Sequence, residues 1–237
     1  MAPRNAAAEP SANEGGSSWR ELAVARSLDP ARVRAEKRVQ RFLDAALDLM
    51  QRSPDKEFTV QEVVERSGQS LRSFYQYFAG KHELLLALFE ESVRSTAENL
   101  RAEIADEKTA EARLHRFATE YYLVCRPTSK SRTTRNRPTP AMAEFAQQLL
   151  TAHPDEASRA FVPLVSLLTE LLDDAADAGA IRPGLEHTRI AGVVLQAIMF
   201  NAFATTISGA IGRQSGQAAA EALWDVVFHG IGSGRRS

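Results

Sequence analysis

The sequence predicts an all-α fold with an N-terminal helix-turn-helix three-helix domain and a larger C-terminal helical domain. Apolar residues recur at intervals of three and four along most of the chain, as on one face of a helix. Short β-branched runs such as Val193-Val194 lie inside these helical patterns, and Pro and Gly clusters separate segments of helical length. The expected parts are a disordered tail at 1–18, a basic extension at 19–30, the three-helix domain at 31–82, the C-terminal domain at 83–230 and a second disordered tail at 231–237.

Two helices are expected ahead of the helix-turn-helix. A short helix at 20–27 ends before Asp29-Pro30, and a longer one runs from about Pro30 to Arg52. The longer segment carries apolar residues at helical spacing, namely Val39, Phe42, Leu43, Ala46, Leu47 and Met50. The turn residues Ser53-Pro54-Asp55 then stop it.

Six further helices follow the helix-turn-helix in this reading, at about 83–104, 109–125, 141–152, 155–178, 187–212 and 217–230. Pro163 lies inside the fourth pattern and predicts a kink or break there. Residues 126–140 form a loop that contains three prolines and five basic side chains.

Composition limits the classes of protein that fit. The net charge is −1 over 237 residues, so any surface for DNA must be a local patch set against an acidic remainder. Cys125 is the only cysteine, which excludes a disulfide or a cysteine zinc site within one chain and fits a reducing cytoplasm. The first residues lack the apolar core of a signal peptide, so we expect a cytoplasmic protein.

One stretch, 190–212, has no charged residue and is long enough to cross a bilayer, which takes about 20 apolar residues. It contains the polar residues Gln196, Asn201, Thr205, Thr206 and Ser208. A lone membrane helix would leave the amides facing lipid. A helix of a soluble protein, buried on two sides, fits better, and no membrane partner is expected.

The most specific pattern runs from Phe58 to Lys81. Thr59 and Glu62 can form a capping box at the start of one helix. Gly68 permits a positive φ in the following turn, and Ser70 can cap a second helix. Two short helices joined by a three-residue turn with glycine are typical of a helix-turn-helix. The alternative is a three-helix packing motif that never touches DNA.

The second helix can be divided into faces at about 100° per residue. Leu71, Phe74 and Phe78 fall together and are expected to face the core. Arg72, Ser73 and Gln76 fall on the opposite side. There an arginine can donate two hydrogen bonds to guanine, and a glutamine can pair with adenine.

Phosphate contacts are expected at the margins of the same helix. Tyr75 and Tyr77 lie at the two edges, and Lys81 begins the next helix, where free backbone amides also attract a phosphate. The full expected DNA-binding set is Thr59, Gln69, Ser70, Leu71, Arg72, Ser73, Tyr75, Gln76, Tyr77 and Lys81.

The segment 67–85 resembles the recognition segment of the TetR/AcrR family of transcriptional regulators. The residues that match the usual family pattern directly are Gly68, Ser70, Tyr75, Phe78, Lys81 and Leu84. Ser73 stands at the threonine position and Phe74 at the leucine position, while Tyr77 replaces a histidine and Arg72 a glycine. The resemblance covers about 39–89. It implies a homodimer on a palindromic double-stranded DNA operator and effector-driven release or retention, but the Arg72 departure leaves the base preference open.

The resemblance also implies a small-molecule effector pocket in the C-terminal domain. The expected lining residues are large or pliable: Phe117, Tyr121, Met142, Phe145, Leu149, Leu168, Met199 and Phe203. For each of them an ordinary core position is the alternative. Candidate polar contacts are Tyr121, Tyr122, Gln196 and Asn201. The basic loop is either solvated or attracts an anionic effector, such as an acyl thioester that bears phosphate.

Two further surfaces are expected to serve assembly and DNA binding. Helix 190–212, with the small residues Ala197, Ala204 and Ser208, is expected to pack on its partner copy together with Trp224 and Phe228. The basic residues at the amino end are Arg20, Arg26, Arg32, Arg34, Lys37, Arg38 and Arg41. They either form an arm along DNA or a solvated helix face.

No enzyme is expected. The five histidines are scattered without metal-ligand spacing, and no phosphate loop, dinucleotide fingerprint or nucleophile elbow occurs. We therefore expect no catalytic residue, no metal and no cofactor. The alternative function is a helical interaction protein without DNA-binding activity.

Overall fold

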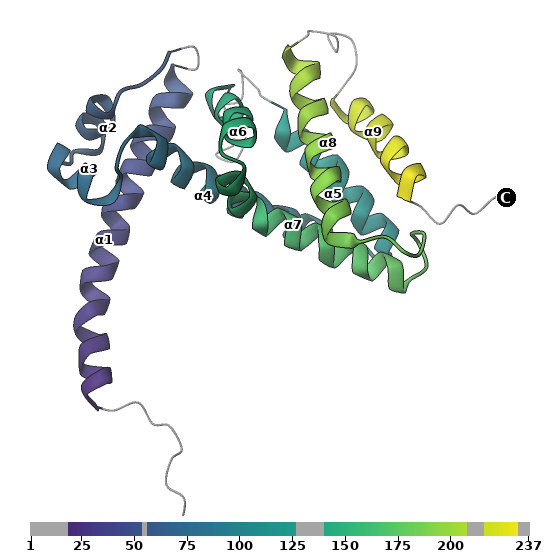
Figure 1. The fold of residues 1–237 in the computed structure, drawn as a ribbon, viewed down its shortest axis with the longest axis horizontal. Helices are drawn as coiled ribbons and strands as arrows, with labels where there is room; N and C mark the ends of the chain where they lie inside the picture. Colours follow the sequence, from purple (N-terminus) through teal and green to yellow (C-terminus); the bar gives the residue numbers. More distant parts are fainter. Residues whose placement is uncertain (1–18, 54–55, 127–139, 208–215, 232–237) are drawn as a thin grey trace, which may run out of the picture. The chain divides into compact units, whose positions relative to one another are not determined.

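The computed structural model describes residues 19–53, 56–126, 140–207 and 216–231. Over these residues the chain is all-α, with nine helices and no strand, as the sequence predicts (Figure 1). The helices are α1 (Trp19–Arg52), α2 (Val60–Ser67), α3 (Leu71–Tyr77), α4 (Lys81–Ile104), α5 (Ala110–Cys125), α6 (Pro140–Ala152), α7 (Pro154–Asp177), α8 (His187–Ile207) and α9 (Gly216–Ile231).

The chain divides into two units, residues 1–41 and 42–237. In the first unit, α1 continues through Pro30, so the two helices expected there are one. Proline removes one backbone hydrogen bond, but the surrounding segment is rich in alanine and arginine, which favour helix strongly. From residue 30 onward most side chains of this unit are exposed, and Arg32 pairs with Glu36 at 2.8 Å.

In the second unit, three aromatic rings form the core around α2 and α3. Phe42 meets Phe74 edge to face at 5.4 Å between ring centroids, and Phe78 lies 5.4 Å from Phe74. Val63 of α2 and Leu84 of α4 are fully buried in the same unit. These contacts hold two short helices that local hydrogen bonding alone would not keep folded.

The position of Leu71 differs from the one expected from the sequence. It was expected to face the core, but 44% of its surface is exposed. The physical reason lies at the other end of the helix. Phe78 has an extended backbone, with φ −134° and ψ 129°, so it reaches the core from beyond the helix and does not mark the helical face. With Phe78 excluded, the inward face centres on Phe74, and Leu71 turns outward.

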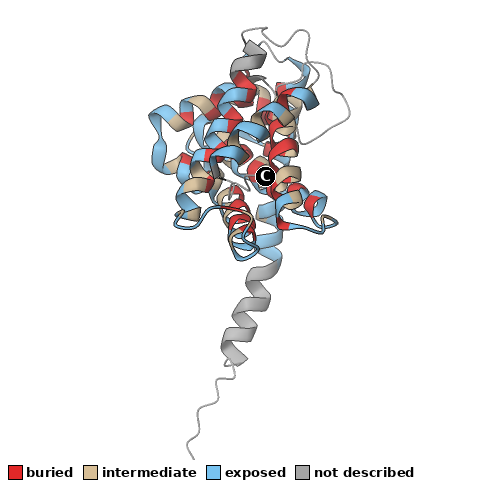
Figure 2. Ribbon diagram, turned by 90° about the vertical axis from the view of Figure 1, so that its right-hand side faces the viewer, coloured by how far each residue is buried: buried red, intermediate tan, exposed pale blue. Residues whose placement is uncertain are grey.

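Four of the larger helices in the second unit, α4, α7, α8 and α9, pack against α5. This helix contacts α7, α8 and α9, while α4 lies against α7 (Figure 1). Buried residues gather on the facing sides and exposed residues on the outer sides (Figure 2). Helix α7 runs unbroken through Pro163, so the expected break does not occur. None of the described helices combines the length and the apolarity that crossing a bilayer requires.

Candidate nucleic-acid interface and effector pocket

Local hydrogen bonds fix the helix-turn-helix as its sequence predicts. The Glu62 amide donates to Thr59 Oγ1 at 3.2 Å, and the Thr59 amide donates to Glu62 Oε2 at 2.7 Å. The backbone hydrogen bond from Thr59 is the main reason that the pKa of Glu62 is lowered. Gly68 has φ +65°, and Ser70 accepts from the Ser73 amide at 3.1 Å. The capping box, the glycine turn and the second cap are therefore confirmed.

The outer face of α3 presents long polar side chains to solvent. Arg72 and Gln76 are exposed, and Tyr75 is 56% exposed. Leu71 belongs to this exposed face, which agrees with its place in the expected DNA-binding set but not with a core role. An arginine and a glutamine four residues apart lie on one side of a helix, as a major-groove reader requires.

Ser73 and Gln69 are placed differently from the rest of the expected set. The Ser73 hydroxyl oxygen and Gln69 Nε2 are shielded from solvent, and neither has a hydrogen-bond partner in the described part of the chain. Ser73 lies beside Phe74 on the inward face, which follows from the same helix rotation that exposes Leu71. The expected position of Ser73 opposite the core is therefore wrong, because its hydroxyl oxygen is shielded from solvent in the described part of the chain.

Lys81 lies at the start of α4, close to an acidic residue. Its ammonium nitrogen is 3.2 Å from Glu57 Oε2 and 4.9 Å from the centre of the Phe58 ring. Gly80, the N-cap of α4, has no side-chain cap, and Glu83 accepts a hydrogen bond from the Ala79 amide at 2.6 Å. A phosphate at this helix start would therefore compete with two carboxylates.

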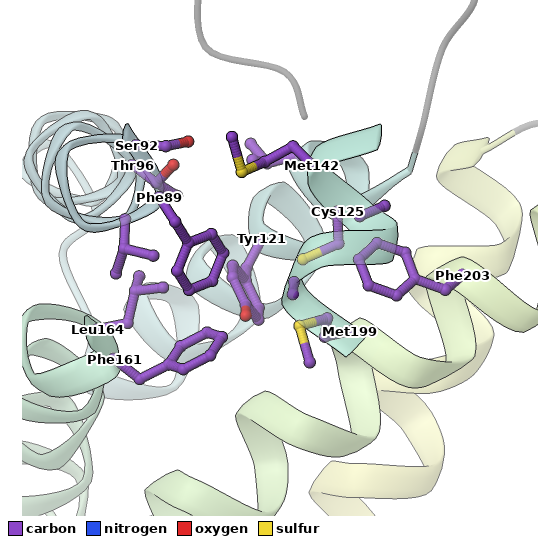
Figure 3. A pocket seen from close by; sticks show the side chains of 14 residues that line it. Phe89, Ser92, Thr96, Tyr121, Cys125, Met142, Phe161, Leu164, Met199 and Phe203 are labelled. Carbon is purple, nitrogen blue, oxygen red and sulfur yellow. The ribbon is translucent and has the colours of Figure 1, made fainter. Parts of the chain in front are cut away.

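A cavity of about 50 Å³ opens among α4, α5, α6, α7 and α8 (Figure 3). Its lining is mostly apolar: Phe89, Ser92, Val93, Thr96, Tyr121, Val124, Cys125, Met142, Ala143, Ala146, Phe161, Leu164, Met199 and Phe203. The rings of Phe89, Tyr121 and Phe161 gather at one side of it, and the few polar groups are hydroxyls and a thiol (Figure 3). Such a lining suits an apolar ligand with few polar groups.

A second cavity, of about 230 Å³, shares a wall with the first. Phe161 and Met199 line both cavities. Gln196 of α8 and Ser158 of α7 are its polar side chains. Small-molecule sites usually span about 300–1,000 Å³, a range that neither cavity reaches by itself.

Two titratable groups on α5 face the first cavity. Burial raises the pKa of the Cys125 thiol to about 12, although a hydrogen bond with Tyr121 opposes part of that rise. Burial also raises the pKa of the Tyr121 phenol well above its ordinary value. Both groups therefore stay protonated at neutral pH. The cavity offers weak donors and no charge.

Comparison with known proteins places the helix-turn-helix in a family. The family described as "Bacterial regulatory proteins, tetR family" matches residues 42–88, which include the capping box, the glycine turn, α3 and the start of α4. Residues 42–88 therefore carry the DNA-binding segment of the TetR family. The family match thus confirms the resemblance seen in the sequence, and the chain is a DNA-binding transcriptional regulator.

Solved structures share the TetR fold over most of the chain. The regulator FadR from Bacillus subtilis, in complex with stearoyl-CoA, has a TM-score of 0.61 and 17% identity over 81% of this chain and 98% of its own. FadR from Bacillus halodurans, a fatty acid degradation regulator, gives 0.60 and 15% over 81% and 98%. SmeT of Stenotrophomonas maltophilia, the repressor of a multidrug efflux pump, gives 0.57 and 15% over 82% and 90%. A comparison with curated protein sequences found no match.

The TetR fold brings together half of the expected pocket residues. Tyr121, Met142, Met199 and Phe203 line the first cavity. The other four, Phe117, Phe145, Leu149 and Leu168, line neither cavity and are buried in the core. Of the expected polar contacts, Gln196 lines the second cavity, whereas Tyr122 is buried and Asn201 is exposed.

Several lining residues were missed. Phe89, Val93 and Thr96 lie on the inward face of α4, and Phe161 and Leu164 lie on α7. The apolar spacing of α4 showed that this face is buried but not that it borders a cavity. The sequence did offer one sign of a cavity, because the polar residues Ser92 and Thr96 occur next to the apolar residues of this helix. The basic loop beyond Arg126 and the side chains of Ala204 and Ser208 lie outside the described residues.

Proposed function

We propose that this protein binds a palindromic operator as a homodimer, represses transcription there, and is released by a small, mostly apolar effector. The observation that carries the proposal is the exposed row of Arg72, Tyr75 and Gln76 on α3, held outward by buried Phe74. Base-reading donors on a rigid helix, next to phosphate-binding groups, are what sequence-specific binding requires.

The proposed dimer interface uses the outer face of α8. Val193 is 57% exposed and Phe200 is 43% exposed, with exposed Ala197 between them at helical spacing. On α9, Val226 is 73% exposed, and Trp224 stacks on Phe228 at 4.8 Å. Exposed apolar side chains that form a continuous stripe without charge are typical of a protein interface, and we propose that a second copy of the chain covers this one.

Sedimentation velocity tests this interface. We expect a dimer for the unaltered chain and a monomer for Val193→Glu/Phe200→Glu. Val162→Glu on α7, a residue 54% exposed outside the stripe, is the matched control and should leave the dimer intact. A monomeric unaltered chain at micromolar concentration, or an unchanged double variant, would contradict the proposed interface.

The effector is proposed to occupy both cavities after Phe161 and Met199 rotate. The TetR-fold neighbour FadR from Bacillus subtilis was solved with stearoyl-CoA, which supports an acyl thioester as the ligand class. The apolar lining suits an acyl chain. Arg126 directly follows the lining residue Cys125, and the sequence after it carries four more basic residues, Lys130, Arg132, Arg135 and Arg137, which we expect to attract the phosphate-bearing end of such a ligand.

A substitution that fills the cavities tests the effector site. Met199→Trp introduces a larger side chain at a position that lines both cavities, whereas Val162→Trp introduces the same side chain at an exposed position of α7. Titration of operator complexes with stearoyl-CoA should release DNA from the unaltered chain and the Val162 variant but not from the Met199 variant. Equal release from all three, or from none, would contradict this site for this ligand.

DNA binding itself is tested on the region upstream of the protein's own gene. We expect fluorescence anisotropy to show binding that weakens steeply with salt, because several phosphates are neutralised. Deleting residues 1–30 asks whether the basic extension contributes: an unchanged affinity and salt slope would exclude it. No binding to any promoter fragment would favour the alternative, a helical interaction protein.

A further inference from the structure

Two histidines and a glutamate from distant parts of the chain meet at the start of α4. His82 Nε2 lies 2.7 Å from Glu156 Oε2, and His153 Nδ1 lies 4.0 Å from the same oxygen. One ligand atom from each of the three residues can be chosen so that all lie within 4.8 Å of one another. His82 and Glu156 are 74 residues apart, so spacing along the sequence gave no sign of the cluster.

The connection between α6 and α7 explains why two of these residues converge. His153 is the N-cap of α7, Pro154 occupies the first helical position, and Glu156 lies in the first turn. The His153 amide donates to the Leu149 carbonyl at 2.9 Å, which ties the turn to the end of α6. Both side chains are therefore carried by a braced helix start and not by a long loop.

His82 reaches this helix start from the first turn of α4. Its ring centroid lies 4.7 Å from that of His153 and 5.7 Å from that of Phe145. The hydrogen bond from His82 is the main reason that the pKa of Glu156 is lowered, so the carboxylate is ionised at neutral pH. Arg159 is the cation that faces the carboxylate from the same helix.

We propose that His82, His153 and Glu156 form a binding site for a divalent transition-metal ion of the Zn²⁺ class. Two imidazoles and one carboxylate are a ligand set that binds zinc and leaves a fourth position open. Imidazole selects for zinc-like ions over magnesium or calcium, which prefer oxygen ligands. All three side chains are reachable from solvent, at 42%, 48% and 28% exposed.

Metal binding requires only small side-chain movements. Ligand bonds of about 2.0–2.1 Å in a tetrahedral site place the ligand atoms about 3.3 Å apart. His153 Nδ1 lies 4.0 Å from Glu156 Oε2 and must approach it, whereas His82 Nε2, at 2.7 Å from the same oxygen, must move slightly away. The bound ion would then link the first turn of α4 to the start of α7.

The consequence is a clamp that joins the DNA-binding segment to the effector-binding helices. His82 directly follows Lys81, the residue proposed to hold a phosphate, so the metal fixes the turn that carries it. We therefore expect Zn²⁺ to change operator affinity by about fivefold or more, a typical coupling between two sites. This consequence rests on the proposed DNA binding, whereas metal uptake does not.

Metal uptake is measured without DNA, on full-length protein carrying no affinity tag. Titration with Zn²⁺ should show one ion per chain, and Co²⁺ should give visible absorption bands that Zn²⁺ abolishes. His153→Gln and Glu156→Gln should each weaken binding by roughly 100-fold, since even outer-sphere losses cost 10–100-fold. Circular dichroism of both variants should show unchanged helical content.

The matched control is His115→Gln. His115 also pairs with a glutamate, because its Nε2 lies 2.6 Å from Oε2 of Glu221. Among the described residues, this pair belongs to no group of three side chains that could hold a metal ion. This variant should bind Zn²⁺ like the unaltered chain. Equal binding by the site variants and the control, or no uptake by the unaltered chain, would overturn the proposed site.

Operator titrations with Zn²⁺ and with a chelator then test the clamp. An effect in the unaltered chain that His153→Gln removes supports it. Metal uptake without any change in operator affinity would overturn the clamp and leave a metal site alone. Absence of DNA binding under both conditions would instead count against the proposed function, and the metal titration would stand separately.

Discussion

The ammonium nitrogen of Lys81 lies 3.2 Å from a carboxylate oxygen of Glu57 at the start of α4. Glu57 is 95% exposed, so the pair is solvated and adds little to stability. In the proposed complex with DNA, Lys81 contacts a phosphate, and the Glu57 carboxylate would compete with that phosphate for the ammonium group. The pair would therefore weaken the phosphate contact that is proposed for Lys81.

Changing each partner of this pair should shift DNA affinity in opposite directions. Glu57→Gln should tighten operator binding by roughly threefold, since it removes a charge that repels phosphate. Lys81→Ala should weaken binding to all sequences alike and reduce the salt slope by about one. Anisotropy titrations at several salt concentrations measure both effects. A looser complex for Glu57→Gln would show that the carboxylate does not face the phosphates.

Arg72→Ala should reduce both affinity and specificity. Loss of a bidentate contact to guanine costs about 1–3 kcal/mol and relaxes the preference at one base pair. Arg94→Ala, an exposed arginine of α4 that pairs with Glu91, is the control for loss of charge alone. Competition between operators that differ at single base pairs measures the change. An unaltered preference would remove Arg72 from the base-reading set.

Phe74→Ala should unfold the DNA-binding segment. Phe74 is fully buried and meets Phe42 edge to face, so its truncation leaves a cavity that costs about 3–5 kcal/mol. Gln76→Ala, an exposed change on the same helix, should alter the free energy of unfolding by less than about 0.5 kcal/mol. Urea unfolding followed by circular dichroism compares the two. Similar stability for both would mean that the ring cluster does not hold α3.

Cys125 should resist alkylation until the protein unfolds. Burial raises its pKa to about 12, so at pH 8 the folded chain holds far less thiolate than the unfolded chain. Iodoacetamide should therefore react roughly a hundredfold or more slowly with folded protein, as mass spectrometry measures.

The same shift makes stability depend on pH. The folded state keeps the thiol proton where the unfolded state, with a pKa near 9, releases it. This contribution to the free energy of unfolding is present below about pH 9 and is lost as pH rises toward 12. Cys125→Ser should show a weaker loss over that range. Fast labelling of the native protein at pH 8 would contradict the burial of this side chain.

Short-range features of the DNA-binding segment could be predicted from the sequence. The capping box of Thr59 and Glu62, the positive φ of Gly68 and the cap at Ser70 depend on residues at most three apart. The predicted faces of α3 were wrong because Phe78, which follows the last helical residue, was assigned a direction by the helical angle of 100° per residue. Because Phe78 is extended, it gave a false position for Leu71 and for Ser73.

The cavities and the histidine cluster depend on contacts between distant helices. Tyr121 and Met199 could be proposed from side-chain type, but Phe161 could not, because only the packing of α7 against α4 and α8 brings it to both cavities. His82 and His153 meet for the same reason. Periodicity identifies which face of a helix is buried but not which helix it meets.

Selection of genomic DNA fragments by the purified protein tests the central claim most directly. We predict enrichment of a two-fold symmetric sequence whose half-sites are separated by about one helical turn. The Arg72→Ala/Gln76→Ala variant, altered only on the exposed face of α3, should lose that enrichment while keeping its helical content. Equal enrichment by the variant, or no sequence enriched by the unaltered chain, would contradict a base-reading role for α3.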